Sequence, residues 1–527
     1  MALNSEQQEV VNAHDGAYAL IAGPGSGKTH TLIARYQALL AKGVRPDEIL
    51  GITFTKEASV EMQRRAGKGQ FRTFHSYGYS VVSAEKGRAP MEPELRHRLI
   101  CKLIRKYGLD YKELTNYISR MRHKNISPAE AMEENGEWKY GFPRAYNEYE
   151  VERMKGGWID FDSMIRDAVN LLEDPNVRQR HQWKYVMADE CQDTDDLQFR
   201  LLQLITEKHG NILCVGDAAQ SIYMFRGAEP KNLLEFTKWF PKAKYLYLGT
   251  NYRSTHAITT FVRENYPIDT PLRERLQPAR LDKGEEIQFR LFNSETDEAE
   301  SAIVSAQKDP LNSAILARTN RMLGPLENFC IENNIKYTLL GRSGFWRQSE
   351  ITRAVEKLKP YSHLNTEAAM SIVMPGVENH YRVEDATEED NDALENLRTL
   401  REISRKFPAC QDFVTFANRA AHAKRSKGIT ISTVHQAKGT EYTNVFLIGA
   451  RDGMIPHSKG EWQEERRIAF VAISRAKDRL RISWAGTPSP FFRKWLPADI
   501  LDQLQVNAAK VERLQKQLNL LDLGAKV

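Results

Sequence analysis

The chain has 527 residues, of which 41% are hydrophobic and 27% charged, with a formal net charge of +6. This composition is typical of a globular protein, and the length predicts about three to four domains rather than one core. The five cysteines are dispersed without a CxxC pair, which argues against a disulfide framework or a zinc site and indicates a reducing compartment. No signal peptide and no membrane-spanning apolar run is present, so we expect a cytoplasmic protein without a membrane partner.

A glycine-rich loop near the N-terminus carries the clearest chemical signal. The apolar run 17–22 predicts a buried parallel strand, and residues 31–40 predict a helix. The segment that joins them reads Ala22, Gly23, Pro24, Gly25, Ser26, Gly27, Lys28 and Thr29. In this context the backbone N–H groups cradle phosphates, Lys28 reaches the terminal phosphates and the Thr29 hydroxyl can ligate Mg²⁺. The chain is therefore predicted to bind a nucleoside triphosphate, although the usual pattern has Gly where Ala22 stands.

Strands and helices continue to alternate after this loop. The runs 49–54 and 71–73 predict strands that end in polar and aromatic residues, the position at which parallel sheets bind ligands. The alternation predicts an α/β doubly wound sheet.

Residues 84–158 lack strand signals and are predicted to form a helical insertion. It is rich in basic residues with aromatics between them: Arg96, Arg98, Lys102, Arg105, Lys106, Arg120, Arg122, His123 and Lys124, with Tyr107, Tyr111 and Tyr117. Such a face either contacts DNA or is an ordinary solvated helix surface, and the interleaved aromatics favour DNA.

Paired acids follow the strand predicted over residues 183–188. One carboxylate of Asp189 and Glu190 suits Mg²⁺, and the other suits the orientation and deprotonation of an attacking water. The alternative is that the acids only cap the helix predicted from Thr194. A further strand at 212–215 leads to polar Gln220. The residues that follow it offer surfaces for bases: Tyr223, Phe225 and Arg226.

A second α/β block begins near residue 250. Its predicted strands are 287–292, 314–317, 336–340, 428–433, 445–448 and 480–484. Residues 351–427 are predicted to be helical and polar, with an acidic loop at 384–392. The tail after Pro497 is predicted to be one helix.

The motifs TFHS, DECQD, GDAAQSIYMFRG, NYRS, TVHQAKGTE and AISRA occur in this order between Leu3 and about Trp484. Together they resemble the UvrD/Rep family of superfamily 1 helicases. The resemblance implies an α/β fold of two RecA-like P-loop NTPase cores, with parallel sheets flanked by helices and a helical insertion in each core. The implied domains are a first core at 1–83 and 159–249, its insertion at 84–158, a second core at 250–350 and 428–497, a reduced insertion at 351–427, and a C-terminal tail at 498–527.

The resemblance also implies the parts of a site for ATP and Mg²⁺. In the first core, Gln7 would bind the adenine edge, Lys28 would hold the phosphates and Thr29 would be a ligand of Mg²⁺. Asp189 would be the second Mg²⁺ contact. Glu190 would be the catalytic base, and Gln220 would sense the γ-phosphate. In the second core, Tyr252 would stack on the base, Arg253 and Arg475 would reach the phosphates, and Glu441 would lie near the ribose. The family commonly has Arg at the position of His30, on the other face of the base.

On the DNA side the resemblance implicates Phe54, His75, Tyr223, Phe225, Arg226, Arg318, Asn320 and His435. The expected function is an ATP-dependent DNA helicase that moves 3′→5′ on single-stranded DNA and at single/double-strand junctions, in a bacterial cell or a phage-infected host. A translocase that displaces proteins and unwinds poorly is the main alternative. An inactive DNA-binding scaffold and the motor half of a helicase–nuclease fit the motifs and the chain length less well.

Two features depart from or extend the family pattern. The insertion at 351–427 is less than half the size usual in the family. The segment Gln517–Leu521 resembles the short motif with which bacterial proteins bind the sliding clamp, although a helix end that packs on the core is the commoner reading of such a match.

Overall fold

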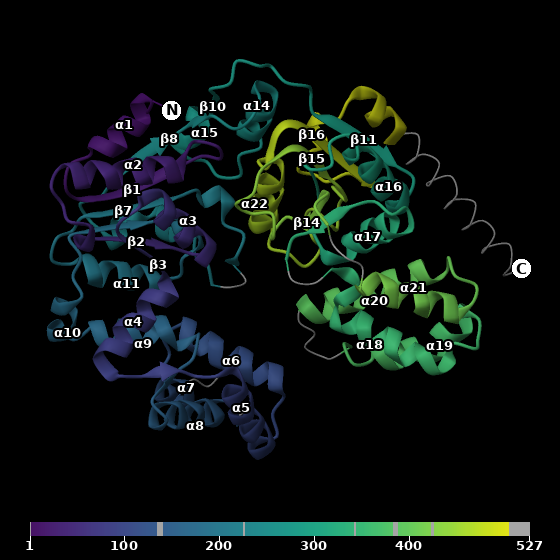
Figure 1. Cartoon of the computed structure of the whole chain (residues 1–527), viewed down its shortest axis with the longest axis horizontal. Helices are drawn as coiled ribbons and strands as arrows, with labels where there is room; N and C mark the ends of the chain where they lie inside the picture. The colour runs from purple at the N-terminus through teal and green to yellow at the C-terminus, as the bar shows by residue number, and fades with distance from the viewer. Residues whose placement is uncertain are drawn as a thin grey trace, which may run out of the picture. The chain divides into compact units, whose positions relative to one another are not determined.

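Two six-stranded parallel sheets organise the chain (Figure 1). The computed structural model describes residues 2–133, 141–224, 227–341, 344–382, 388–422 and 426–504. A first unit comprises the residues up to Thr250 together with Thr270–Arg275, and a second unit comprises Asn251–Asp269 and the residues from Leu276 on. Each unit contains one of the two sheets, so the prediction of two RecA-like α/β cores is confirmed.

The first sheet has the strand order β3-β2-β6-β7-β1-β8. Its strands are β1 (Ala17–Ala22), β2 (Ile49–Thr53), β3 (Gln70–Thr73), β6 (Tyr185–Ala188), β7 (Ile212–Gly216) and β8 (Lys244–Leu248). All neighbours pair in parallel, and Ile21 of β1 is in register with Gly216 on one side and Tyr247 on the other. The carboxyl ends of β6, β7 and β1 therefore lie side by side at one edge, where open α/β sheets bind ligands.

Helices cover both faces of this sheet, and several of them begin at a side-chain cap. They are α1 (Ser5–Asn12), α2 (Lys28–Ala41), α3 (Lys56–Ala66), α4 (Phe74–Lys86), α9 (Ser163–Leu172), α10 (Pro175–Arg180), α11 (Asp196–Thr206), α12 (Lys231–Leu234), α13 (Phe236–Trp239) and α15 (Pro271–Arg275). Asn4, Thr55, Thr73 and Asp195 cap α1, α3, α4 and α11 by accepting a hydrogen bond from a first-turn N–H. Among the described residues, 3₁₀ turns lie in the connections at η1 (Pro46–Glu48), η2 (Cys191–Asp193) and η3 (Ala218–Gln220).

The helical insertion of the first unit is a small bundle that lies beyond α4 and α9 (Figure 1). Its helices are α5 (Pro93–Tyr107), α6 (Tyr111–His123), α7 (Pro128–Glu133) and α8 (Gly141–Lys155). Their apolar faces share a core that includes Ile100, Leu114 and Tyr146. The expectation that strands are lacking is wrong in detail, because β4 (Ala89–Pro90) and β5 (Trp158–Ile159) pair in parallel where the bundle begins and ends.

Two members of the predicted basic and aromatic face lie inside the bundle instead. Arg122 is 1% exposed and Tyr117 is 2% exposed, so the prediction that they contribute to an exposed DNA-binding face is wrong. On the surface, Lys106 forms an ion pair with Glu148 over 2.6 Å. The sequence pattern shows residue type and spacing, but burial depends on which face of α6 meets α8.

Arg122 is the centre of a buried ion-pair network that joins α6, α8 and the segment before α9. Its guanidinium donates to both carboxylate oxygens of Asp160, over 2.7 and 2.8 Å, and to Glu150. Arg153 donates to Glu150 over 2.9 Å and to Asp167 over 2.8 Å. Burial alone would raise the pKa of the Asp160 and Glu150 carboxyls, but the charge of Arg122 outweighs it and holds both below their usual range. Their stabilising effect is therefore present above the unfolded-state pKa of about 4 and is lost as the pH falls through the folded-state values.

Replacement of Arg122 by Ala is expected to lower the free energy of unfolding by about 3–5 kcal/mol, because it leaves the buried Asp160 carboxylate without its cation and removes one of the cations paired with Glu150. Urea denaturation at pH 7, followed by tryptophan fluorescence, measures the change. Lys106→Ala is the control, since it removes an exposed ion pair and should hardly move the midpoint. Equal shifts in the two variants would contradict a structural role for the network.

The second sheet has the strand order β11-β16-β15-β12-β14-β13. Its strands are β11 (Gln288–Phe292), β12 (Ser313–Ala317), β13 (Tyr337–Leu339), β14 (Ile429–Thr433), β15 (Tyr442–Leu447) and β16 (Ala476–Ala485). Every neighbouring pair is again parallel, with Ile315 of β12 in register with Ile431 and Phe446. The remaining elements of this core are α14 (His256–Glu264), α16 (Glu295–Ala306), α17 (Leu323–Glu332), α22 (Trp462–Ile473), η5 (Asn320–Met322), η6 (Phe345–Arg347), η8 (Arg493–Trp495) and the short paired strands β9 (Thr250–Asn251) and β10 (Gln277–Pro278).

The insertion of the second unit is a compact helical bundle with its own apolar core. It comprises α18 (Ser349–Leu358), η7 (Lys359–Tyr361), α19 (Thr366–Glu378), α20 (Glu388–Ser404) and α21 (Cys410–His422). Ile351, Met374, Leu397 and Phe413 are completely buried in that core, so the description of this segment as merely polar is wrong. The predicted acidic loop is helical from Glu388, and its residues 384–387 lie outside the described residues.

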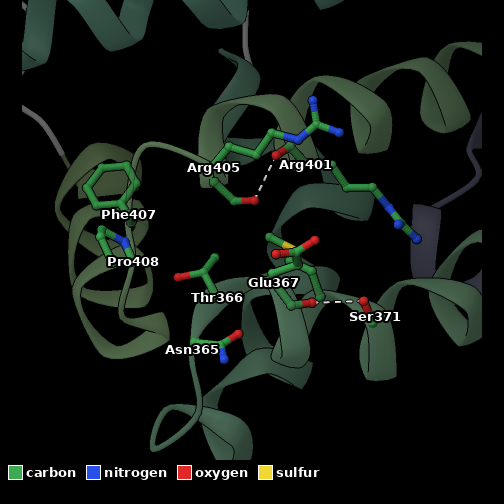
Figure 2. A pocket seen from close by; sticks show the side chains of 10 residues that line it. Asn365, Thr366, Glu367, Ser371, Arg401, Arg405, Phe407 and Pro408 are labelled. Atoms are coloured by element: carbon green, nitrogen blue, oxygen red, sulfur yellow. Dashed lines mark hydrogen bonds between the residues drawn. The ribbon is translucent and has the colours of Figure 1, made fainter.

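A cavity of about 580 Å³ opens on this bundle, between the start of α19 and the connection from α20 to α21 (Figure 2). Its lining combines Glu367 with Arg401 and Arg405, so both signs of charge are present. The hydrogen bonds drawn there are local: Ser404 donates to the Arg401 carbonyl and Ser371 donates to the Glu367 carbonyl.

The C-terminal tail is helical from residue 498 to 504. The clamp-like segment Gln517–Leu521 lies outside the described residues.

Candidate functional site

The glycine loop after β1 has the backbone shape of a phosphate cradle. Gly25 and Gly27 have φ angles of 71° and 81°, in the left-handed region that favours glycine. The Ser26 hydroxyl donates to the carbonyl oxygen of Gly23 over 2.7 Å. Helix α2 begins at Lys28, earlier than the sequence predicts, so its N-terminal N–H groups and the positive end of its dipole lie at the loop. An anion fits this position.

Two side chains predicted to serve the nucleotide lie against this loop. Lys28 Nζ donates to the carbonyl oxygen of Ala22 over 3.3 Å and so spans the loop. Gln7 is 4% exposed, and its Nε2 donates to the carbonyl oxygen of Ser26 over 3.1 Å. A capping box with Asn4 fixes the Gln7 side chain from the other end. His30, the third residue of α2, is exposed.

The first of the paired acids lies at the end of β6, two strands from β1. Asp189 is 4% exposed, and its Oδ1 accepts a hydrogen bond from the Glu190 N–H over 3.0 Å. Burial, and then the charge of Glu190, raise the pKa of the Asp189 carboxyl, while the charge of Lys28 opposes them. The Asp189 carboxylate and the Thr29 hydroxyl are hard oxygen ligands, the type that Mg²⁺ prefers. Asp189 follows β6 and Thr29 lies in the first turn of α2 after β1, so both come after strands that end at the same sheet edge.

The second acid belongs to a hydrogen-bonded chain that reaches the end of β7. Glu190 has a φ of 55°, a left-handed conformation that is costly for a residue other than glycine. Its carboxylate accepts a hydrogen bond from the Gln192 amide, whose oxygen accepts one from the Asp217 N–H over 3.0 Å. Gln220 Nε2 in turn donates to Asp217 Oδ2 over 2.7 Å. The sequence reasoning gave roles to Glu190 and Gln220 and missed Gln192 and Asp217, although both stand in the quoted motifs.

The second unit assembles its own group of predicted nucleotide residues. Glu441 forms ion pairs with Arg253 and with Lys477, both over 2.6 Å. Arg253 also donates to the Ser474 carbonyl over 3.1 Å. Burial would raise the pKa of Glu441, but Arg253 and Lys477 outweigh it and hold it below the usual value. The sequence reasoning missed Lys477, two residues after Arg475.

Arg475 is 2% exposed and lies beside this group. Its guanidinium donates to the carbonyl oxygens of Thr440, over 3.1 Å, and Val471, over 3.0 Å, and to the Ser474 hydroxyl over 2.9 Å. The partly buried ring of Tyr252 directly precedes Arg253 in the chain. The second unit thus positions two arginines and one acid close together.

The predicted DNA residues of the first unit include two stacked aromatic pairs. Phe54, after β2, stacks on Tyr223 with ring centroids 6.2 Å apart and an angle of 8° between the rings. His75, after β3, stacks on Phe161 at 3.9 Å and 12°. Phe161 is 63% exposed and was missed, since a single aromatic beside a helix start gives no sequence signal. Burial lowers the pKa of His75 to about 4, which keeps this ring neutral near pH 7. The predicted residues Phe225 and Arg226 lie outside the described residues.

In the second unit, the predicted DNA residues lie at the carboxyl edge of the sheet. Arg318 and Asn320 follow β12, and His435 follows the neighbouring strand β14. Arg318 is held by Glu465, to which it donates over 2.6 and 3.0 Å, and its side chain is 10% exposed. The predicted nucleotide residues Glu441 and Arg475 lie instead at the amino edge, directly before the paired strands β15 and β16.

The parallel sheets, the glycine loop at a helix N-terminus and the buried acid on the adjoining strands define a P-loop NTPase with two RecA-like cores. A family model described as the UvrD/REP helicase N-terminal domain matches residues 3–241, and one described as the UvrD-like helicase C-terminal domain matches 246–378 and 377–487. The chain therefore belongs to the UvrD/REP helicase family, which confirms the resemblance drawn from its motifs.

Individual relatives support the same conclusion along the whole chain. The chain is 28% identical to the ATP-dependent DNA helicase PcrA of Staphylococcus aureus (strain NCTC 8325 / PS 47), over 93% of this chain and 84% of that protein. It is 27% identical to the protein of the same name in Staphylococcus epidermidis (strain ATCC 12228 / FDA PCI 1200), over 95% and 87%. The alignments span 614 and 633 positions, more than the 527 residues of this chain, so these relatives carry inserted residues that it lacks.

Within the ranges given above, no helix is both long and apolar enough to cross a bilayer. In the same ranges, no cluster of three or more His, Cys, Asp or Glu residues is arranged to hold a metal ion.

Proposed function

We propose that the protein is an ATP-dependent DNA helicase that moves on single-stranded DNA and couples ATP hydrolysis to strand separation. The observation that best supports this proposal is the short segment between Asp217 and Tyr223. Gln220 in this segment is hydrogen-bonded into the acid network, and Tyr223, three residues later, stacks on Phe54. A shift of Gln220 on a change at the γ-phosphate of a bound nucleotide can therefore be passed to Tyr223, on whose ring bases could stack, through the three residues of backbone between them. The 3′→5′ direction rests on the family alone.

The chemistry proposed for the first unit is the hydrolysis of the terminal phosphoanhydride bond of ATP. Lys28 and the N–H groups at the start of α2 hold the phosphates, and Gln7 binds the adenine edge. Glu190 orients a water and takes its proton as the water attacks the γ-phosphorus. Mg²⁺, held by Thr29 and Asp189, would neutralise charge on the β- and γ-phosphate oxygens. ADP and phosphate are the products.

Arg253 and Arg475 complete the proposed site from the second unit. Their guanidinium groups would stabilise the charge that develops on the phosphoryl group in the transition state. Because the phosphate loop and the arginines belong to different units, hydrolysis would require the units to close on the nucleotide. Repeated closing and opening would shift the two units along a strand that lies across Phe54, His75, Phe161 and His435.

A protein-displacing translocase with little unwinding activity is the second candidate. One observation favours keeping it: the C-terminal family match divides at residues 377–378, inside the shortened insertion. The relatives carry inserted residues that this chain lacks, and we infer that part of them falls at this division. The same observation also fits a helicase that needs no release from a large inhibitory insertion.

The test of the proposed function is steady-state ATP hydrolysis with single-stranded DNA, duplex DNA and RNA of equal length. We expect the largest stimulation with single-stranded DNA, and a steep fall in DNA affinity with rising salt as phosphate contacts release counterions. Equal rates with and without DNA would contradict the proposal. A strand-displacement assay beside a streptavidin-displacement assay, both under single-turnover conditions, then separates the helicase from the protein-displacing translocase.

A further inference from the structure

Gln192 lies in the middle of the acid site and has no exposed surface. It is the central residue of the 3₁₀ turn η2, which follows directly on Glu190. The left-handed backbone of Glu190, with a φ of 55°, starts this turn. A costly conformation is kept where surrounding contacts over-determine it, and the Gln192 side chain provides such contacts.

The Gln192 amide joins two segments that are distant in the sequence. Its Nε2 donates to the Glu190 carboxylate, and its Oε1 accepts from the Asp217 N–H over 3.0 Å. The carboxylate can only accept and the N–H can only donate, so the amide has one orientation that satisfies both partners. A rotation of the amide by 180° would break both hydrogen bonds at once. Glu190 and the end of β7 are thereby held in a fixed relation.

Space for this amide comes from a glycine at the end of β7. A Cβ atom at Gly216 would lie 2.4 Å from Gln192 Oε1, closer than any real contact of this kind. The amide is thus packed directly against the strand that leads to Asp217. From there the chain of contacts continues, since Asp217 Oδ2 accepts from Gln220 Nε2 over 2.7 Å and Asp217 Oδ1 accepts from the Ala219 N–H over 3.1 Å.

We propose that Gln192 is a positioning residue that holds the Glu190 carboxylate against the water and ties it to the segment bearing Gln220. This inference rests on the proposed function, in which Glu190 is the base and Gln220 senses the γ-phosphate. Gln192 itself touches neither nucleotide nor water in this mechanism. It acts through Glu190, so its loss lowers the rate of hydrolysis and leaves the affinity for ATP nearly unchanged.

The chain offers a matched control for a buried glutamine with a purely structural role. Gln198 in α11 is 5% exposed, and its Nε2 donates to the Asp195 carboxylate over 3.2 Å. Like Gln192, it is buried in the first unit and donates its amide to an acid. It has no hydrogen bond to Glu190, Asp217 or Gln220 among those described. Replacement of either glutamine by Met conserves volume and removes the amide.

The experiment measures ATP affinity by equilibrium binding, and kcat with saturating single-stranded DNA, for the full-length wild type, Gln192→Met, Gln192→Asn and Gln198→Met. We expect Gln192→Met to lower kcat roughly 10- to 100-fold, the size of effect that a misplaced catalytic group produces, with ATP affinity within about threefold of wild type. Gln198→Met should keep kcat within about threefold. Gln192→Asn retains the amide on a shorter side chain and should fall between the two. Thermal unfolding verifies that all variants are folded, and Gln192→Asn serves as the test if Gln192→Met is not.

A double-mutant cycle with Glu190→Gln tests whether Gln192 acts through Glu190. In the Glu190→Gln background, Gln192→Met should change the residual single-turnover rate less than about threefold, because the group it positions is already absent. The inference is overturned if Gln192→Met retains wild-type kcat, if its loss of kcat equals its loss of ATP affinity, if Gln198→Met loses as much, or if the two changes are additive. A wild type without DNA-stimulated hydrolysis would contradict the proposed function instead, so the two failures are distinguishable.

Discussion

Replacement of Glu190 by Gln is expected to abolish DNA-stimulated ATP hydrolysis while DNA binding survives. The substitution keeps the size of the side chain, and its amide oxygen can still accept from Gln192, so the turn at the end of β6 should persist. The amide cannot take a proton from water at neutral pH. General-base catalysis contributes about 10²–10⁴ to a rate, so a loss of at least that size is expected.

The measurement is the DNA-stimulated rate of phosphate release, paired with equilibrium binding of ATP and of labelled single-stranded DNA. Glu173→Gln is the control, because Glu173 is an acid of the same unit whose ion pair with Arg200 is partly exposed, and it has no hydrogen bond to Glu190 among those described. Lys28→Ala should also abolish turnover, but for a different reason, because the variant loses the side chain that holds the nucleotide phosphates. Retained turnover in Glu190→Gln would overturn the assignment of this residue as the base.

The placement of the phosphate loop and the paired acids at one sheet edge could be predicted from the sequence, because the signals for both are local. The phosphate loop occupies consecutive residues between a strand and a helix, and Asp189 and Glu190 directly follow a buried strand. In such cases spacing along the chain determines position in the fold, since the carboxyl ends of parallel strands meet at one edge. The strands predicted for both cores lie within a few residues of the observed ones for the same reason.

Features that depend on tertiary packing were not predictable in this way. Arg122 and Tyr117 have the residue types of a DNA-binding face, yet the packing of α6 on α8 buries both. Phe161 is a single aromatic residue in a connection, and only the fold places it on His75. The orientation of the Gln192 amide likewise follows from Asp217, which lies 25 residues further along the chain.

In the second unit, the residues predicted to bind DNA and those predicted to bind the nucleotide lie at different edges of the sheet. Arg318 and His435 follow strands β12 and β14, and Glu441 and Arg475 precede strands β15 and β16. In a sheet whose strands are all parallel, these are opposite edges. The sheet therefore lies between the residues assigned to DNA and those assigned to the nucleotide. If the arginines moved when they bound a phosphate, the sheet would carry the residues assigned to DNA along with them.

Arg253→Ala should have the other large effect, a loss of about 10³–10⁵ in the rate of hydrolysis, which is the range found for arginines that stabilise a transferring phosphoryl group. This corresponds to about 4–7 kcal/mol of transition-state stabilisation. The side chain is 17% exposed and is held in place by Glu441 and the Ser474 carbonyl, so its guanidinium is preorganised. We therefore expect the substitution to lower kcat, because the charge that the guanidinium stabilises develops only in the transition state.

Arg253→Lys distinguishes this role from a general need for positive charge. Lys keeps the charge but loses the planar fork that can bind the Glu441 carboxylate and a phosphate oxygen together, so it should recover only part of the rate. Single-turnover hydrolysis with bound single-stranded DNA measures the chemical step, and equilibrium binding of ATP measures the ground state. Arg479→Ala is the control, since Arg479 is an arginine of the same unit, 61% exposed and paired with Glu285. If Arg253→Ala weakened ATP binding as much as it slowed hydrolysis, Arg253 would contribute to ATP binding and not specifically to transition-state stabilisation. The proposal that hydrolysis requires closure of the two units would then lose its chemical basis.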